Sequence, residues 1–383
     1  MENKKKALLS LFLVVATELI GFGLIIPILP QIVKSFESST LKIGILISAY
    51  SFAQFIAAPI LGKWSDKIGR KPILIYSKLG SVVAYIILAF SNHFYMFLIA
   101  RLLDGFTGGN IAVARAYVSD ICSKEEKSKG MAIIGIAFGC GFILGPILGG
   151  LLFSTQFGHL IPSLVASFLS FLAFILTIIL LKEPAKIKTQ TPSTIKDFFK
   201  IFKNKTILII LTCYLLFMLI FAGFESTFSI FTNTIFNFTE TQNSWLFVYV
   251  GLVALLVQGK IARKKLANPL PLIYIGFANI LIGCLCLALS TNLVFLLLSL
   301  FIFSIGTSLI FSFLPALLTI HTSDSNTGYV MGVYESIGSF SRIVAPLLAV
   351  FLILELSAKT GYILLCPLAI LALVFLTKLK NGK

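Results

Sequence analysis

Charged residues are scarce in this chain. They make up 12% of its 383 residues, while 58% are hydrophobic and the mean hydropathy is +1.00. Such a chain is too long for one compact soluble domain and too apolar for two. It has only three histidines, none clustered with acids, and neither a glycine-rich phosphate-binding loop nor a D-x-x-x-D metal motif. A membrane-embedded enzyme or an ATP-driven pump is therefore the remote alternative, and we expect no catalytic residues, no cofactor and no metal site.

Cysteine pairs of the C-x-x-C type are also lacking. The six cysteines lie in or beside apolar stretches, at positions 122, 140, 213, 284, 286 and 366. This pattern indicates neither a disulfide framework nor a metal site. We expect these side chains to be packing residues.

Apolar runs long enough to cross a membrane recur along the whole chain. About 20 helical residues span a hydrocarbon core of about 30 Å. The runs predict twelve spans, at 7–30, 42–61, 73–91, 94–118, 131–153, 159–181, 206–232, 243–259, 270–290, 293–319, 327–354 and 360–378. The first run is long, contains Glu18 and shows no small-residue cleavage site, so we expect an uncleaved span and not a signal peptide. The fold class that follows is an all-α membrane protein.

Positively charged loops set the orientation of these spans. Lysine and arginine gather at both ends of the chain and in alternate loops, while the other side carries only Lys34, Lys42 and Lys359. By the positive-inside rule the rich side faces the cytoplasm, and both termini lie there. This topology accounts for most of the net charge of +16, so nucleic acid is not expected as a partner. We expect a multi-pass, monomeric protein in the plasma (cytoplasmic) membrane of a prokaryote.

The longest polar interval, 182–205, divides the chain into two parts. We predict an N-terminal six-helix bundle at 1–181, a linker at 182–205 and a C-terminal six-helix bundle at 206–383. Within the linker, Ile195, Phe198, Phe199 and Phe202 have helical spacing, with lysines opposite. A basic amphipathic helix of this kind lies on the anionic inner leaflet. A calmodulin-like target site is the alternative on pattern alone.

The two halves echo each other. Gly62, Lys63 and Pro72 recur at one constant spacing as Gly259, Lys260 and Pro269. Gly145-Pro146 in the fifth span is likewise matched by Ala345-Pro346 in the eleventh. Parallel repeats of this kind are typical of one large class of secondary transporters.

A charged elbow, LGKWSDKIGRKP at residues 61–72, follows the second span. We interpret it as a short cytoplasmic loop in which Gly62 and Gly69 permit tight turns. Lysines alone would be enough to orient the spans in the membrane, since acids contribute little to orientation. The presence of Asp66 therefore indicates a specific contact. Asp66 is suited to a helix N-terminus, and Arg70 to a carboxylate or a helix C-terminus. The alternative is a purely topogenic loop.

The fifth span contains GCGFILGPILGG at residues 139–150. Gly141, Gly145 and Gly149 stand four apart and form a stripe for close helix contact. Pro146 favours a bend, and Gly150 ends the motif. A packing stripe with a kink is the purely structural interpretation.

The elbow, G-x-x-x-D-x-x-G-R-K, closely resembles the signature loop of the major facilitator superfamily, and the span-five pattern G-x-x-x-G-P-x-x-G-G resembles the antiporter signature of its drug/proton exporters. GFGLIIPILP in the first span and RLLDGFTGGNIAVARAYVSDI in the fourth are similar to twelve-span drug exporters and to the tetracycline-efflux branch. The resemblance implies two pseudo-symmetric bundles around a central cavity. It also implies a latch from Asp66 to the start of the eleventh span, near Thr327 and Gly328.

Ionisable residues within spans are the best pointers to mechanism, because an isolated charge in hydrocarbon is costly. Glu18 lies about 16 Å into the membrane at 1.5 Å per residue. We expect Asp104 to pair with Arg101, one turn away on the same face. Glu18 is therefore preferred over Asp104 as the proton-coupling acid, because no base lies within a turn of it and its nearest lysine is Lys6.

Three further residues complete the candidates. Glu335 and Arg342 share a face of the eleventh span two turns apart, so we expect water or another helix to link them. Glu225 of the GFEST stretch is expected near the outer rim. Arg115 departs from the family pattern, and we expect it to reach the cytoplasmic interface along the membrane surface. Glu225, Glu335, Arg342 and Arg101 are candidates for cavity or substrate contacts, with structural or gating roles as the alternative.

The resemblance implies a proton-coupled antiporter that exports a lipophilic or amphiphilic compound, such as tetracycline, by alternating access. Its partners would be a small-molecule substrate, protons and the lipid bilayer, with the proton gradient as the energy source. A sugar, peptide or metabolite carrier, or a uniporter, is the alternative within transport. The sequence does not name the substrate.

Overall fold

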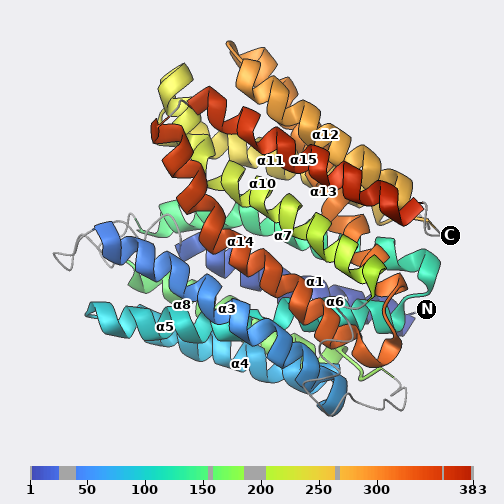
Figure 1. Ribbon diagram of the computed structural model, residues 1–383. Coiled ribbons are helices and arrows are strands. Elements are labelled where there is room, and N and C mark those ends of the chain that lie inside the picture. Colours follow the sequence, from blue (N-terminus) through green and yellow to red (C-terminus); the bar gives the residue numbers. More distant parts are fainter. Residues whose placement is uncertain are drawn as a thin grey trace. The chain divides into compact units, whose positions relative to one another are not determined.

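The computed structural model describes residues 2–25, 40–153, 158–184, 204–263, 268–355 and 358–380, which are helical with short connections and no strand. The helices (Figure 1) are α1 (Glu2–Ile25), α3 (Thr40–Ile68), α4 (Arg70–Ala89), α5 (Phe94–Gly108), α6 (Asn110–Ile121), α7 (Lys127–Phe153), α8 (Leu160–Leu180), α10 (Lys205–Phe236), α11 (Glu240–Ile261), α12 (Leu270–Leu289), α13 (Leu293–Ile320), α14 (Thr327–Glu355) and α15 (Ala358–Lys380). The amphipathic helix predicted in the linker falls at 194–202, outside the described residues.

Ten of the described helical segments are long and apolar enough to cross a membrane. One of them combines α5 and α6. Helices α3 and α14 coincide with the two remaining predicted spans, at 42–61 and 327–354. The prediction of an all-α membrane fold is confirmed.

The chain divides into two compact units. Unit 1 comprises 1–122, 136–191 and 323–339, and unit 2 comprises 123–135, 192–322 and 340–383. Each unit thus includes the start of one helix from the other half of the sequence: α14 in unit 1 and α7 in unit 2. These are the fifth and eleventh spans, which the sequence repeat relates to each other. The domain boundaries at 181 and 206 stay a prediction.

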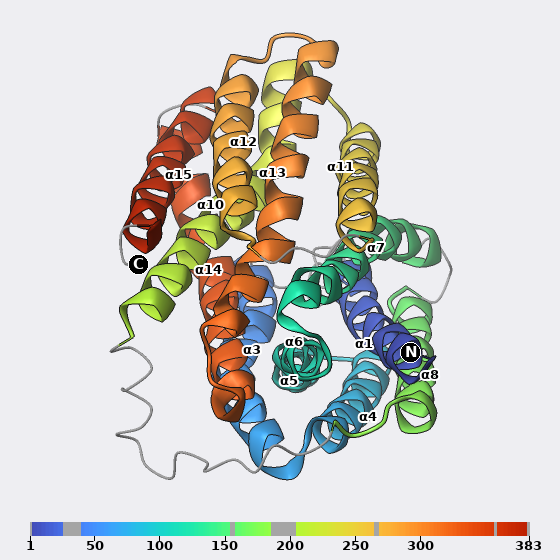
Figure 2. The same cartoon turned by 90° about the vertical axis from the view of Figure 1, so that its right-hand side faces the viewer.

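In unit 1, α5 and α6 form the centre. They pack against α3 and α4, and α6 also contacts α1. Figure 2 shows α5 and α6 nearly end-on, with these helices around them. Helix α8 covers α1 and α4 from outside. Side chains on α5 and α6 are therefore shielded on several sides.

In unit 2, α13 and α15 make most of the contacts with the other helices. Helix α12 packs against both of them, α10 contacts both, and α11 contacts α13. An aromatic cluster joins α10 to α13: the ring of Phe311 lies 4.9 Å from that of Phe217 and 5.2 Å from that of Phe221, edge-on to both. Edge-to-face pairs of this kind add to the stabilisation from burial itself.

The fourth predicted span is broken into two helices. Gly109, with φ −60° and ψ −7°, separates α5 from α6. Gly105 and Gly108 precede it and lie against Tyr50 of α3, where a Cβ atom at either position would clash. The small residues of this stretch therefore serve the close approach of α3 and α5.

The elbow is more helical than the sequence analysis predicts. Helix α3 continues through Asp66 to Ile68, and α4 begins at Arg70. Only Gly69 breaks the helical path, with a φ of 115° that favours glycine. The tight turn predicted at Gly62 is wrong, because Gly62 lies inside α3, where the backbone of Gly328 leaves no room for a side chain.

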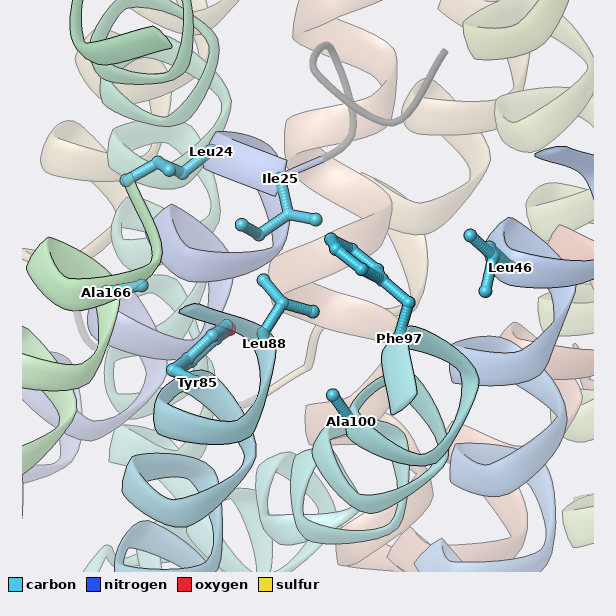
Figure 3. Packing of buried hydrophobic residues seen from close by; sticks show 8 residues of the cluster. All are labelled: Leu24, Ile25, Leu46, Tyr85, Leu88, Phe97, Ala100 and Ala166. Carbon is cyan, nitrogen blue, oxygen red and sulfur yellow. The ribbon is translucent and has the colours of Figure 1, made fainter. Parts of the chain in front are cut away.

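An apolar cluster of unit 1 surrounds the end of α1 that follows Glu18 (Figure 3). Leu24 and Ile25 of α1 pack with Tyr85 and Leu88 of α4, and with Phe97 of α5. All five are at most 1% exposed. Burying a large apolar side chain contributes about 1.5–3 kcal/mol, so this cluster both stabilises the unit and keeps water from one end of its interior.

The glycine stripe of α7 packs against α1, as its four-residue spacing predicts. A Cβ atom on Gly141 would clash with Leu19, one on Gly145 would lie 2.7 Å from the Cα of Gly23, and one on Gly149 would lie 2.5 Å from the carbonyl oxygen of Leu24. The stripe therefore brings the two helix backbones together beside Glu18. Pro146 and Gly150 belong to the same helix.

We predict that Gly145→Val lowers the stability of the protein by about 1–3 kcal/mol, the usual effect of overpacking. The added side chain would push α7 away from α1. Thermal unfolding of the detergent-purified protein measures the effect. Gly259→Ala is the matched control, because a Cβ atom there meets nothing within 4 Å. Equal stability of the two variants would show that α7 and α1 do not approach closely.

Candidate functional site

Asp66 caps the start of α14. Its Oδ1 accepts a hydrogen bond from the backbone N–H of Gly328 at 2.9 Å, and its Oδ2 accepts one from Tyr329 at 2.9 Å. The first N–H groups of a helix have no partner within the helix, and the helix dipole favours an anion there. The structure thus places Asp66 against the start of the eleventh span, as the resemblance implies. The partners are Gly328 and Tyr329, not Thr327.

Arg70 connects two carboxylates beside this cap. Its Nη1 lies 2.6 Å from Asp66 Oδ1, and its Nε donates to Asp120 Oδ2 at 2.8 Å. Nη1 also donates to Ser65 Oγ at 2.6 Å. Arg70 is 5% exposed, so these contacts are shielded from solvent. They join the elbow, at the end of α3 and the start of α4, to the end of α6.

Glu183 caps α4 in the same region. Its Oε1 accepts from the backbone N–H of Arg70 at 2.7 Å, and its Oε2 accepts from that of Lys71 at 2.8 Å. Lys71 Nζ donates in turn to the carbonyl oxygen of Ile178 at 2.8 Å. The segment after α8 is therefore fixed to the elbow by two helix N-terminal hydrogen bonds.

Glu18 lies fully buried within unit 1. Its Oε2 is 2.7 Å from Lys78 Nζ of α4, and the side chains of both residues are 0% exposed. Asn110 Nδ2 of α6 donates to the same oxygen at 3.2 Å, and Ser81 Oγ donates at 3.4 Å. The expectation that Lys6 is the nearest lysine to Glu18 is therefore wrong: Lys78 reaches Glu18 from another helix. A neighbouring base thus does not distinguish Glu18 from Asp104, which has Arg101 beside it.

Asp104 and Arg101 form the second buried pair, as their spacing predicts. Arg101 Nη1 lies 3.0 Å from Asp104 Oδ2, and the two side chains are 0% and 1% exposed. The guanidinium also stands over the rings of Tyr50, at 4.7 Å, and Phe22, at 5.8 Å. Aromatic faces stabilise a desolvated cation.

Hydrogen bonds join the two pairs into one polar interior, which we call the buried charge cluster (Glu18, Lys78, Arg101 and Asp104). Ser81 Oγ, beside Glu18, lies 3.0 Å from Thr107 Oγ1, which lies 3.0 Å from the carbonyl oxygen of Asp104. Each hydroxyl has one proton, so Ser81 donates either to Glu18 or to Thr107 while Thr107 donates to Asp104. The cluster holds two acids and two bases, so its charges balance when all four are ionised.

Several polar atoms of this interior have no hydrogen-bond partner among the described residues. They are Glu18 Oε1, Asp104 Oδ1, Asn110 Oδ1, Tyr85 Oη, and Nε and Nη2 of Arg101. Buried polar atoms in native proteins are normally hydrogen-bonded, so each exception calls for an explanation, such as a catalytic role or a bound water or ion. Glu18 therefore has one oxygen held by donors and one oxygen without a hydrogen-bond partner among the described residues.

Arg115 forms a further buried ion pair in unit 1. Its Nε lies 2.7 Å from Glu335 Oε1 on α14, with the side chains 2% and 3% exposed. Phe138 and Tyr334 lie 5.8 Å and 5.2 Å from its guanidinium carbon. The expectation that Arg115 reaches the membrane interface is wrong. The link that Glu335 was expected to make through another helix is present, but it leads to Arg115 and not to Arg342.

Arg342 and Glu225 belong to unit 2. Arg342 lies on α14 and Glu225 on α10. Glu225 is partly buried in the middle part of α10, and the hydroxyl of Thr227 beside it bonds back to the carbonyl oxygen of Gly223 at 2.7 Å. Of the predicted cavity residues, Arg101 and Glu335 thus lie in unit 1, and Glu225 and Arg342 in unit 2.

The sequence analysis missed Lys78, Asn110, Asp120 and Glu183. Lys78 carried a usable signal, because a lysine in the middle of an apolar span is as unusual as Glu18 itself. Its partner, however, is 60 positions away in the sequence. Asp120 and Glu183 follow apolar spans and look like ordinary terminal acids.

Known proteins similar to this chain are membrane transporters. The family model described as Major Facilitator Superfamily matches residues 11–342. The tetracycline resistance protein, class H, of Pasteurella multocida is 30% identical over 360 residues, covering 91% of this chain and 89% of the relative. Multidrug resistance protein 2 of Bacillus subtilis (strain 168) is 30% identical over 344 residues, covering 86% and 84%.

Human relatives are similar over the same length. Human major facilitator superfamily domain-containing protein 10 is 27% identical over 406 residues, covering 90% of this chain and 87% of the relative. The crystal structure of the human organic anion transporter MFSD10 (TETRAN) superposes with a TM-score of 0.88 at 24% identity, covering 97% of this chain and 99% of that one. That likeness gives the fold.

We predict that the stability effects of Glu18→Gln and Lys78→Met are strongly non-additive. Removing one partner of a buried ion pair costs about 3–5 kcal/mol, because it leaves the other charge uncompensated, whereas removing both is close to neutral. Lys78→Met should therefore destabilise the protein, and the double variant should recover most of the loss. Denaturant unfolding of the four proteins in detergent gives the coupling free energy. Additivity within about 0.5 kcal/mol would mean that the two groups do not interact.

Proposed function

The chain belongs to the major facilitator superfamily, and we propose that it is a proton-coupled antiporter that exports a lipophilic or amphiphilic small molecule by alternating access. It is a membrane transporter by family. The direction of transport, the proton coupling and the drug-like substrate are our proposal. The names of the tetracycline and multidrug resistance relatives support export.

The observation that carries the proposal is the environment of Glu18. A carboxyl group without exposed surface accepts hydrogen bonds from Lys78 and Asn110 on Oε2, with the Ser81 hydroxyl 3.4 Å away, and has Oε1 unpartnered among the described residues. Such a group can exist in two protonation states inside the membrane, since the donors stabilise the carboxylate and burial stabilises the acid. A carrier of one proton needs both states.

Charge balance provides the coupling in this mechanism. With all four groups ionised, the buried charge cluster is neutral, and a proton on Glu18 adds one positive charge to a poorly solvated interior. Binding of a proton and binding of the substrate would therefore compete in this part of the protein. A proton taken up on the outer side would be released to the cytoplasm as the next substrate molecule binds.

The cap on α14 supplies the conformational step. When Asp66 holds Gly328 and Tyr329, the starts of α14 and α4 are tied together. In the predicted topology these are the cytoplasmic ends of their spans. The Arg115–Glu335 pair joins α6 to α14 about two turns further along. Access from the cytoplasm would require both contacts to break. We assign the role of a conformational latch to Gly62, Asp66, Gly69 and Arg70.

We predict that inverted membrane vesicles containing the protein accumulate tetracycline, or another member of a panel of dyes, antibiotics and sugars, only while a proton gradient is present. A protonophore should abolish the accumulation. Glu18→Gln should abolish it too while preserving substrate binding, because the amide keeps the shape of the carboxyl but cannot lose a proton. Lys124→Gln, at an exposed position before α7, is the control.

Two results would contradict the proposal. Transport that is independent of the proton gradient for every transported compound would exclude antiport. Accumulation of sugars but of no lipophilic compound would favour a metabolite carrier of the same superfamily.

We predict that Asp66→Asn slows transport about tenfold or more without impairing membrane insertion. A hydrogen bond to a charged group contributes about 1.5–3 kcal/mol, and about 1.4 kcal/mol is a factor of ten. Initial rates at equal protein amount measure the effect, with Lys67→Asn on the exposed side of the elbow as the control.

Crosslinking tests the movement of this contact directly. A cysteine pair at positions 67 and 325, at the exposed end of α3 and in the turn before α14, leaves Asp66 and Gly328 in place. It should crosslink to different extents with and without transported substrate. If Asp66→Asn transports at the normal rate and the crosslinking does not depend on substrate, the elbow serves only the orientation of the spans.

A further inference from the structure

Lys78 is a buried base to which no motif draws attention. It lies on α4 with a side chain that is 0% exposed, and its Nζ is 2.7 Å from Glu18 Oε2 and 3.2 Å from Thr17 Oγ1. It belongs neither to the elbow nor to the glycine stripe. A lysine buried in a membrane-spanning helix is costly, and such residues mark functional sites.

The other groups that face Glu18 do not replace this charge. Helix α5 contributes Asp104 and Arg101, which neutralise each other at 3.0 Å. Tyr85 of α4 and Tyr50 of α3 contribute only phenol groups. Helix α6 contributes the neutral amide of Asn110. Helix α8 has no ionisable side chain between Leu160 and Leu180, and α7 meets α1 through its glycines. Lys78 is thus the base in direct contact with Glu18 among the described residues.

The consequence is a difference between the two protonation states of Glu18. As a carboxylate, Glu18 compensates Lys78, and the buried charge cluster is neutral. As a carboxylic acid, it leaves Lys78 with an uncompensated positive charge in a dry interior. Lys78 therefore favours loss of the proton, whereas burial alone would retain it.

We propose that Lys78 is the positioning residue that enables Glu18 to release its proton. Lys78 holds Oε2 of Glu18, and its positive charge is balanced by the carboxylate that remains once the proton has left. The inference deepens the proposed function, on which its role in antiport rests. Without Lys78, the carboxyl of Glu18 would lack the neighbouring positive charge that favours loss of its proton, and binding of the substrate would not displace that proton.

The proposal is tested without any substrate, by infrared titration of the purified protein in detergent. The probe is the C=O band of protonated carboxyl groups, and subtraction of the Glu18→Gln spectrum isolates the contribution of Glu18. In the Lys78→Met variant the midpoint of this band should move upward by about one to three pH units, the effect of one opposite charge at close range. Lys78→Arg should retain a midpoint close to that of the unaltered protein, since it retains the charge.

Lys205→Met, at the exposed start of α10, is the matched control and should not move the midpoint. If Lys78→Met proves too unstable to titrate, Lys78→Gln and Lys78→Arg are compared, and the amide variant should show the higher midpoint. A midpoint equal in all these variants would overturn the proposal and leave Lys78 a structural partner.

The outcomes separate this inference from the proposed function. A Lys78-dependent midpoint without proton-driven transport in vesicles would refute antiport and leave the role of Lys78 in the titration intact. Proton-driven transport that requires Glu18, together with a midpoint unaffected at Lys78, would support antiport and refute the role of Lys78.

Discussion

The cost of placing a charge inside a membrane protein determines where the ionisable residues of this chain lie. Glu18 is buried because Lys78 lies 2.7 Å away, and Asp104 is buried because Arg101 lies 3.0 Å away. A third pair, Glu335 and Arg115, follows the same rule between α14 and α6. Removing one partner of such a pair is strongly destabilising, because it leaves a buried charge uncompensated.

Close packing of helices makes these pairs possible. The glycines of α7 bring its backbone against α1 beside Glu18, and Gly108 brings α5 close to Tyr50 and to Glu18, whose Oε1 would lie 3.1 Å from a Cβ atom at position 108. Apolar residues around Tyr85 close the interior next to them. The glycine motifs and the buried charges are therefore parts of one arrangement, in which small residues exclude water from a polar interior.

Local spacing was sufficient to predict part of this arrangement. The apolar runs predicted the spans, the three-residue spacing predicted the Arg101–Asp104 pair, and the four-residue glycine spacing predicted the contact face of α7. The contact of Asp66 with the start of α14 was implied by family resemblance. Each of these contacts was predictable because it depends either on the spacing of residues along a single helix or on a motif shared with a known family.

Contacts between helices far apart in the sequence were not predictable in this way. Lys78 and Glu18 are 60 positions apart, and nothing in their local sequences specifies how α1 and α4 are rotated towards each other. The same holds for Arg115, whose partner lies on α14 and whose local pattern resembles that of an interfacial arginine. The helical path of the elbow was missed because its glycines read as turns, although only Gly69 has a positive φ.

The central claim is that Glu18 carries the exchanged proton and that Lys78 positions Glu18 and favours release of that proton. Proton release on addition of tetracycline, or of the substrate found in vesicles, to the detergent-solubilised protein tests it most directly, with a pH-sensitive dye as the readout. The account predicts release from the unaltered protein and from Asp104→Asn, and none from Glu18→Gln. Release that persists in Glu18→Gln and disappears in Asp104→Asn would contradict it and assign the proton to Asp104.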